Sequence, residues 1–166
     1  PYMSTSVYVE GEALSDQQVV IGHAQTYVDF PAWQVTDFLV DWTNPERIQA
    51  ENTGEISRSI LFLENEHSKV VDIIVDFQAP FLGKIRYVMK MLWKEIRPGR
   101  YFILMTNTMF EDLEDSPKAQ IALGNLTCGY TVQGSHDGES CHVSHNMVAH
   151  FPLTGDKFFT LFKPRT

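Results

Sequence analysis

The histidines of this chain are its first candidates for chemistry, because imidazole serves as a metal ligand and as a general base. His142 and His145 are three residues apart, and in a strand this odd offset places the two rings on opposite faces. His142 and His150 share a face, but eight residues of strand separate them by roughly 26 Å. Zinc needs its ligands within about 2.0–2.3 Å. The spacing therefore predicts no metal site, and we expect no cofactor.

The cysteines and the acidic side chains also lack the neighbours that catalysis requires. Cys128 stands beside Gly129, but a reactive thiolate needs a base close by, and the sequence identifies none. Asp72 and Asp76 are expected on the solvated face of a strand, where carboxylates contribute to solubility. The chain has no G-x-S-x-G elbow, no P-loop and no G-x-G-x-x-G turn. We therefore expect a protein that is not an enzyme.

Two consecutive segments, 69–78 and 85–96, alternate between apolar and polar residues. Side chains of a strand alternate between its faces, so each segment predicts a strand with one buried and one solvated face. Pro80 cannot donate to a sheet ladder and marks the break between them. The apolar face of the second strand carries Tyr87, Met89, Met91 and Trp93. Long and aromatic side chains of this kind either fill a core or line a cavity for a flexible apolar ligand.

The order of the other elements predicts an α+β fold. Residues 1–17 show little periodicity and read as an N-terminal arm before a domain at 18–166. A helix is expected over 30–41, where Trp33, Phe38, Leu39 and Trp42 recur near helical spacing, and a second short helix or turn begins at Thr43. Further strands at 18–29, 56–63, 101–110, 121–133 and 141–151 bring the antiparallel sheet to about seven. Two small helices cannot cover a curved sheet of that size, so either a cavity remains or something outside the chain fills it.

Four segments resemble START lipid-binding domains in character and order. They are Phe30-Pro31 followed by Val35-x-x-Phe38-Leu39, Ala79-Pro80-Phe81 followed by Arg86, the turn Arg97-Pro98-Gly99-Arg100, and the hairpin 128–132 to 145–151. The resemblance spans residues 18–158. It implies a helix-grip fold: a curved antiparallel sheet, a short helical pair after the first strand, and a C-terminal helix that closes the cavity.

The chain departs from the START pattern at two places. The acidic partner of the family's Arg-Asp pair is Tyr87 here, and only fifteen residues follow Phe151, so the closing helix is truncated. Phe158, Phe159 and Phe162 would form one face of the short helix that remains. We expect them to cap the open groove, either within their own chain or against a second copy or another subunit.

The resemblance implies non-catalytic binding of a single lipid or sterol in a hydrophobic cavity, and by extension its transfer. The candidate lining residues are Val75, Phe77, Tyr87, Met89, Met91, Trp93, Tyr130, His145 and Met147. His145 is expected to point inward, as a core histidine or as a ligand contact. At the START position of Arg86 the arginine ties an Ω-loop to the sheet, and the same loop-anchoring role is expected here. The alternative function is a protein-interaction module or subunit that keeps the fold without transferring lipid.

The net charge and the basic residues limit the partners that the sequence predicts, and the cysteines indicate a location. The net charge of −8 over 166 residues argues against binding to nucleic acid. Arg86, Lys90 and Lys94 share one strand face. Their charges either keep an exposed strand from pairing with another chain or bind acidic lipid headgroups or an acidic protein. Cys128 is expected to face about Asn146, and Cys141 about Gln133, too far out of register for a disulfide. Free thiols suit a reducing, cytoplasmic location.

Overall fold

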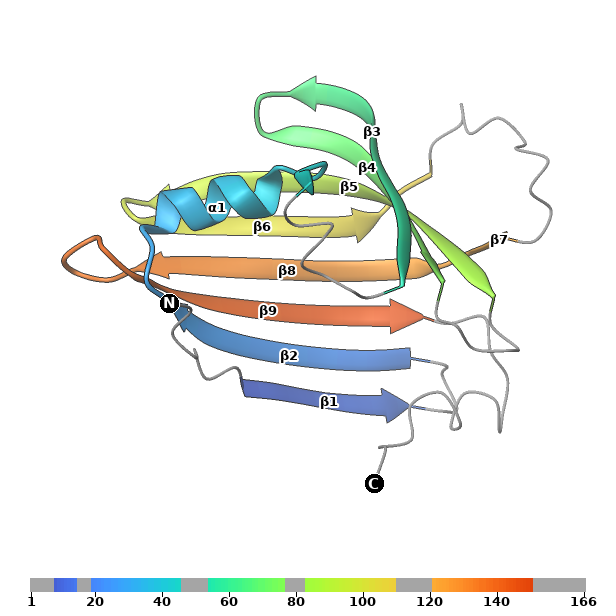
Figure 1. The fold of residues 1–166 in the computed structure, drawn as a ribbon, viewed down its shortest axis with the longest axis horizontal. Helices are drawn as coiled ribbons and strands as arrows, with labels where there is room; N and C mark the ends of the chain where they lie inside the picture. The colour runs from blue at the N-terminus through green and yellow to red at the C-terminus, as the bar shows by residue number, and fades with distance from the viewer. Residues whose placement is uncertain (1–7, 15–18, 46–53, 77–82, 110–120, 151–166) are drawn as a thin grey trace.

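A single sheet dominates the computed structural model, which describes residues 8–14, 19–45, 54–76, 83–109 and 121–150. Within these residues nine strands hydrogen-bond in the order β1-β2-β9-β8-β6-β5-β4-β3, and β7 pairs with β5 off this path (Figure 1). All pairs are antiparallel except β5 with β7. The strands are β1 (Tyr8–Leu14), β2 (Val19–Val28), β3 (Glu55–Asn65), β4 (Ser68–Asp76), β5 (Lys84–Arg97), β6 (Arg100–Asn107), β7 (Ile121–Leu123), β8 (Asn125–Gly134) and β9 (Cys141–His150).

The seven strands expected from the sequence are all present, with two additions. Part of the expected N-terminal arm forms β1, which pairs with β2 from Tyr8 opposite Gln25 to Leu14 opposite Val19. The sequence did not predict a strand in this segment, and the division into an arm and a domain stays a prediction. The single strand expected at 121–133 divides at Gly124 into β7 and β8.

One helix, α1 (Ala32–Val40), packs on β6 and β8. Its buried side chains are Ala32 and Thr36, whereas Trp33 and Phe38 are 54% and 40% exposed. The spacing predicted the helix correctly, and of its other two residues Trp42 is buried in the core and Leu39 packs against it. Residues 42–43 form a turn, and the rest of the second short helix or turn expected from Thr43 extends beyond residue 45, outside the described part of the chain. Of the described helices, none has the length and apolarity needed to cross a membrane.

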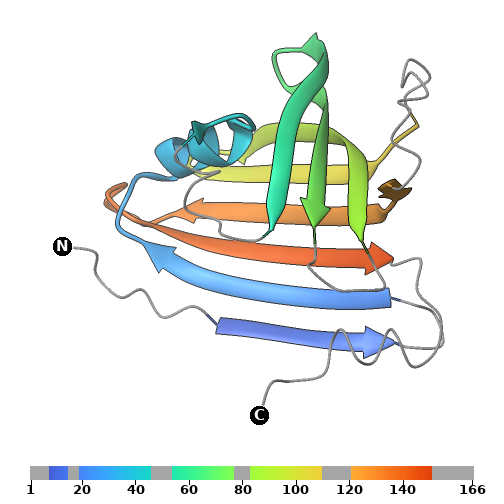
Figure 2. The same cartoon turned by 45° about the vertical axis from the view of Figure 1, so that its right-hand side comes forward.

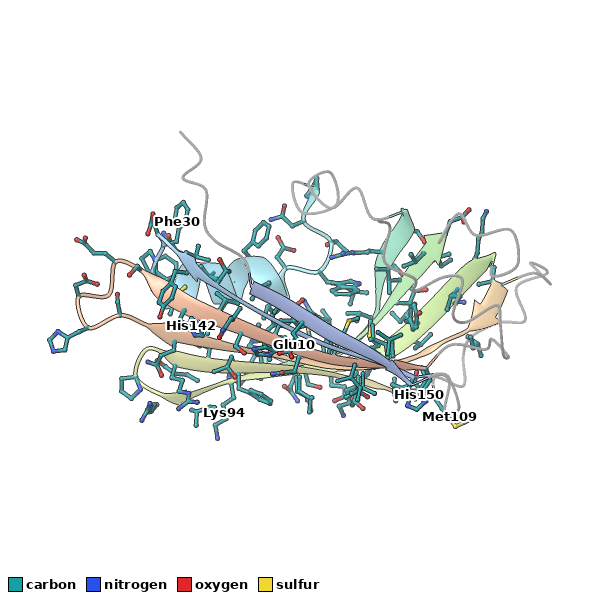
Figure 3. The ribbon with its side chains drawn as sticks, turned by 90° about the horizontal axis from the view of Figure 1, so that it is seen from below. Glu10, Phe30, Lys94, Met109, His142 and His150 are labelled. Carbon is teal, nitrogen blue, oxygen red and sulfur yellow. The ribbon has the colours of Figure 1, made fainter. Side chains whose placement is uncertain are left out.

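The sheet is curved, because β3, β4 and the start of β5 rise toward the side on which α1 lies (Figures 2 and 3). We call this concave side the inner face and the opposite side the outer face. The main core lies on the inner face. Its buried members are Trp42, Val71, Ile85, Tyr87, Met89, Met91, Ile103, Met105, Cys128 and Ala149.

The two cysteines are free and buried, as the hairpin register predicted. Cys128 lies opposite Met147 and Cys141 opposite Gly134, each one residue from the expected partner. The turn sets this register, since Ser135 N donates to Ser140 O at 2.9 Å. Burial raises the pKa of the Cys141 thiol, which keeps it in the unreactive protonated form.

Candidate functional site

The register of β4 and β5 brings the expected lining residues of these strands together on the inner face. Ile73 lies opposite Tyr87, and Val71 opposite Met89. Tyr87, Met89 and Met91 are 4%, 1% and 0% exposed, so they form a packed floor. The sequence alternation therefore placed these side chains on the correct face.

A second group of lining candidates comes from β8 and β9. Tyr130 lies opposite His145, and the two rings stack with centroids 4.2 Å apart. Met147 packs against the main core beside the floor. His145 therefore lies on the inner face, whereas His142 lies on the outer face and its ring centroid is 4.9 Å from that of Tyr27. Phe77, the remaining candidate, lies outside the described residues.

The inner face is not uniformly closed. Val75, Trp93, Tyr130 and Met147 are only partly buried although they pack against the core. Part of the apolar surface of each therefore stays accessible. A bound apolar ligand could rest on the buried floor and cover the accessible apolar surface of these four side chains.

Lys69 is an inner-face residue whose position the sequence reasoning missed. Its side chain is only 6% exposed, its Nζ donates to Val40 O at 2.5 Å, and the same atom lies 5.3 Å from the Trp93 ring centroid. The ammonium thereby meets the carbonyl end of α1, where the helix dipole favours a cation. The sequence could have shown this position, because Lys69 is an even number of residues from Val71 and Ile73 and therefore shares their strand face.

Arg58 is a second cation on this face. It pairs across the sheet with Ile73, and its guanidinium lies 4.5 Å from the ring centroid of Trp42. Trp42 is held in turn, because its Nε1 donates to Asp72 O at 3.0 Å. Two cationic side chains therefore lie at the edge of an otherwise apolar surface.

Tyr87 adds a neutral polar group to the inner face. Burial raises the pKa of its phenol to about 12, so the hydroxyl keeps its proton at neutral pH. In this form the oxygen can both donate and accept a hydrogen bond. The START resemblance implies an acid at this position, whereas Tyr87 is buried in the main core.

The partner of Arg86 comes from the neighbouring strand. Its Nε and Nη2 donate to Asp72 Oδ2 at 2.9 and 2.6 Å, and Ser59 Oγ donates to the other carboxylate oxygen. Asp72 is only 4% exposed, so the expectation of a solvated carboxylate is wrong. Arg86 and Ser59 come from the strands on either side of Asp72 and cover it.

The backbone of Arg86 also holds the junction of β7 and β8. Gly124 N donates to Arg86 O at 2.9 Å, and β7 pairs with 84–86 of β5. Residues 77–82 and 110–120, which flank these strands, lie outside the described part of the chain. The loop-anchoring role of Arg86 therefore stays a prediction.

The basic stripe of β5 is largely neutralised. Arg86 pairs with Asp72 as described, and Lys90 Nζ lies 2.7 Å from Glu64 Oε2. Of the three stripe residues only Lys94 makes no ion pair with the described residues of the chain. The stripe is thus a weaker attraction for acidic headgroups than the sequence indicated.

The Lys90–Glu64 pair predicts a pH dependence. Hydrogen bonds from Lys90 and Ser68 lower the pKa of Glu64 below its ordinary value of 4.5. A lowered pKa stabilises the fold above the ordinary pKa, and this contribution disappears as the pH falls through the folded-state pKa. We expect Lys90→Met to raise the pKa of Glu64, as measured by NMR titration of its side-chain carboxyl. An identical pKa in both proteins would contradict the pairing.

The described residues contain no group of three or more His, Cys, Asp or Glu side chains that could hold a metal ion. The inner face instead combines apolar surface, two cations and a phenol. Such a surface suits binding of an amphipathic molecule through burial and hydrogen bonds.

By sequence, the chain matches no family model and no curated protein. Solved structures match it closely in shape. Human STARD10 has a TM-score of 0.74 at 15% identity, with 96% of this chain and 63% of that chain covered. The human StarD13 (DLC2) lipid transfer and protein localization domain has a TM-score of 0.70 at 11% identity, with coverage of 96% and 77%.

A bacterial protein gives the same result. The STAR-related lipid transfer protein from Xanthomonas axonopodis has a TM-score of 0.71 at 10% identity, covering 95% of this chain and 86% of that chain. This chain therefore has the START-like helix-grip fold, as the sequence pattern predicted. It spans less than two thirds of the STARD10 structure.

Proposed function

We propose that this protein binds a single lipid or sterol on the inner face of its sheet, without chemistry on the ligand. The observation that carries the proposal is the packed floor of Tyr87, Met89 and Met91, which is surrounded by partly buried apolar side chains. The START-like fold supports it, because three similar structures of this fold are described as lipid-transfer proteins or domains.

Burial of apolar ligand surface would drive binding. Each 100 Å² of apolar surface removed from water contributes about 2.5 kcal/mol. Trp93, Tyr130 and Met147 are the side chains whose remaining exposed surface a ligand would cover. His145 would be shielded together with Tyr130, on which it stacks.

Polar groups at the rim would orient the ligand head. Lys69 and Arg58 carry N–H donors, and the Tyr87 hydroxyl can donate or accept. These groups favour a ligand whose head bears oxygen acceptors.

The alternative function is an interaction module that uses the same fold to bind a protein. The observation that favours it is the exposed pair Trp33 and Phe38 on α1. Large apolar side chains exposed on a surface helix are typical of a surface that another chain covers. The role proposed for Phe158, Phe159 and Phe162 in capping or oligomerisation belongs to this alternative, and these residues lie outside the described part of the chain. A cytoplasmic location is part of both proposals and is supported by the free thiols.

Native mass spectrometry after mild purification tests the two functions, with Met147→Trp as the diagnostic variant. Met147 is partly buried on the inner face, so the larger ring should occupy ligand volume and lower the co-purified lipid at least several-fold. Val148→Trp is the matched control, because Val148 is the next residue and its side chain is 37% exposed on the outer face.

Lipid retained in Val148→Trp and lost in Met147→Trp supports inner-face binding. The free energy of unfolding of Met147→Trp should change by less than the 1–3 kcal/mol that is typical, as an order of magnitude, of overpacking a closed core. No co-purified lipid in any of the three proteins, together with a protein partner captured by wild type, would favour the interaction module.

A further inference from the structure

A groove lies on the outer face of the sheet, opposite the proposed lipid site. Its volume is about 460 Å³, within the range of roughly 300–1,000 Å³ found for ligand pockets. Two cross-strand pairs form its floor, Leu92 with Leu104 and Lys94 with Phe102. Figure 3 shows Lys94 on the side of the sheet away from α1.

The wall of the groove is the turn between β3 and β4, and hydrogen bonds hold it in place. Trp93 N donates to His67 O at 3.1 Å, so the turn is attached to β5. Within the turn, His67 N donates to Asn65 Oδ1 at 2.9 Å, and Ser68 Oγ donates to Glu64 at 2.6 Å. The groove is therefore pre-formed and needs little ordering to accept a ligand.

The floor offers apolar surface to a ligand. Leu92 and Phe102 are 37% and 39% exposed although both belong to the interior strands of the sheet. Leu104 extends the same surface between them. Side chains that are half-exposed at the centre of a sheet present an apolar patch that a chain or ring of matching size can cover.

The charge of the groove favours an anion. Lys94 lies at its edge, and none of the residues that line it is acidic. Two acids contact the wall of the groove, and each has a basic neighbour: Glu64, which accepts from Ser68, also pairs with Lys90, and Glu66 lies 3.6 Å from His67. Lys94 supplies one compact positive charge at the edge of the groove, which one carboxylate would neutralise.

We propose that this outer groove binds an apolar chain that ends in one carboxylate, with the chain on Leu92, Leu104 and Phe102 and the carboxylate at Lys94. This site lies on the outer face and does not depend on the proposed function, although Trp93, which packs against the inner-face core, also lines the groove.

Decanoate and its neutral counterpart decan-1-ol test the proposal by calorimetry and by NMR of leucine methyl groups. Decanoate should shift the methyl signals of Leu92 and Leu104. The methyl signals of Leu126, which packs on the inner face, should stay unchanged. Lys94→Gln should weaken decanoate about tenfold, or about 1.4 kcal/mol. Lys84→Gln is the matched control, because Lys84 is an exposed lysine of the same strand outside the groove.

Three results would overturn the proposal: equal affinity in wild type and Lys94→Gln, tighter binding of decan-1-ol than of decanoate, or shifts at Leu126 instead of Leu92 and Leu104. The last result would place decanoate on the inner face and so support the proposed lipid site. Met147→Trp separates the two sites, because it should leave decanoate binding to the outer groove unchanged while lowering the co-purified lipid.

Discussion

Replacing Arg86 with methionine is expected to lower the free energy of unfolding by about 3–5 kcal/mol, the typical result of removing one partner from a buried ion pair. The side chain of Asp72 is 6% exposed and that of Arg86 is 21% exposed. Without the guanidinium, the carboxylate keeps only the Ser59 hydroxyl among the side-chain partners described above. A buried charge with so little compensation must either stay ionised at high cost or take up a proton.

Urea denaturation followed by circular dichroism measures this effect. Lys94→Met is the control, because Lys94 lies on the same face of the same strand and makes no ion pair with described residues. Its stability should equal that of wild type within about 0.5 kcal/mol. The double variant Arg86→Met/Asp72→Asn should recover part of the loss, since no charge remains buried. A loss below about 1 kcal/mol in Arg86→Met would mean that the pair is solvated and acts as a surface salt bridge.

Gly124→Ala is expected to cost about 1–3 kcal/mol or more, through overpacking of the core. A Cβ at residue 124 would lie 2.2 Å from Tyr87 Cε1 and 2.6 Å from Ile85 Cγ2. Ile85 is fully buried and Tyr87 is 4% exposed, so neither side chain has space to move away. The same glycine donates its N–H to Arg86 O, so a displaced backbone would also disturb the β7–β8 junction.

Gly129→Ala separates this clash from a general cost of adding a methyl group to β8. A Cβ at residue 129 would meet its nearest atom, Ile103 O, at 3.5 Å, which is ordinary van der Waals contact. Gly129→Ala should therefore leave the urea midpoint within error of wild type, while Gly124→Ala lowers it. Removing the ring in the double variant Gly124→Ala/Tyr87→Val should lower the free energy of unfolding by less than the sum of the two single changes. Equal midpoints for the two alanine variants would contradict the close approach at Gly124.

Much of the fold could be predicted from the sequence because strand alternation is a local property. Tyr87, Met89, Met91 and Trp93 repeat with period two, and any sheet with a buried face must place them together. The order of strands and the short helix after the first of them then resembled START domains, and the structure has that fold. The role of Gly124 could not be predicted from the sequence, since a lone glycine in a strand pattern marks either a bulge or a close approach of another segment.

Only the tertiary structure decided which side chains of different strands and helices contact one another. Asp72 and Arg86 are fourteen residues apart, and the register of β4 with β5, set by hydrogen bonds along both strands, brings them into contact. The polarity of Asp72 predicted solvent, but two flanking strands bury it. Lys69 shows the same effect on the inner face, because the end of α1 arrives beside it from another part of the chain. Alternation determines the face of a residue, whereas burial and pairing depend on which strands and helices become its neighbours.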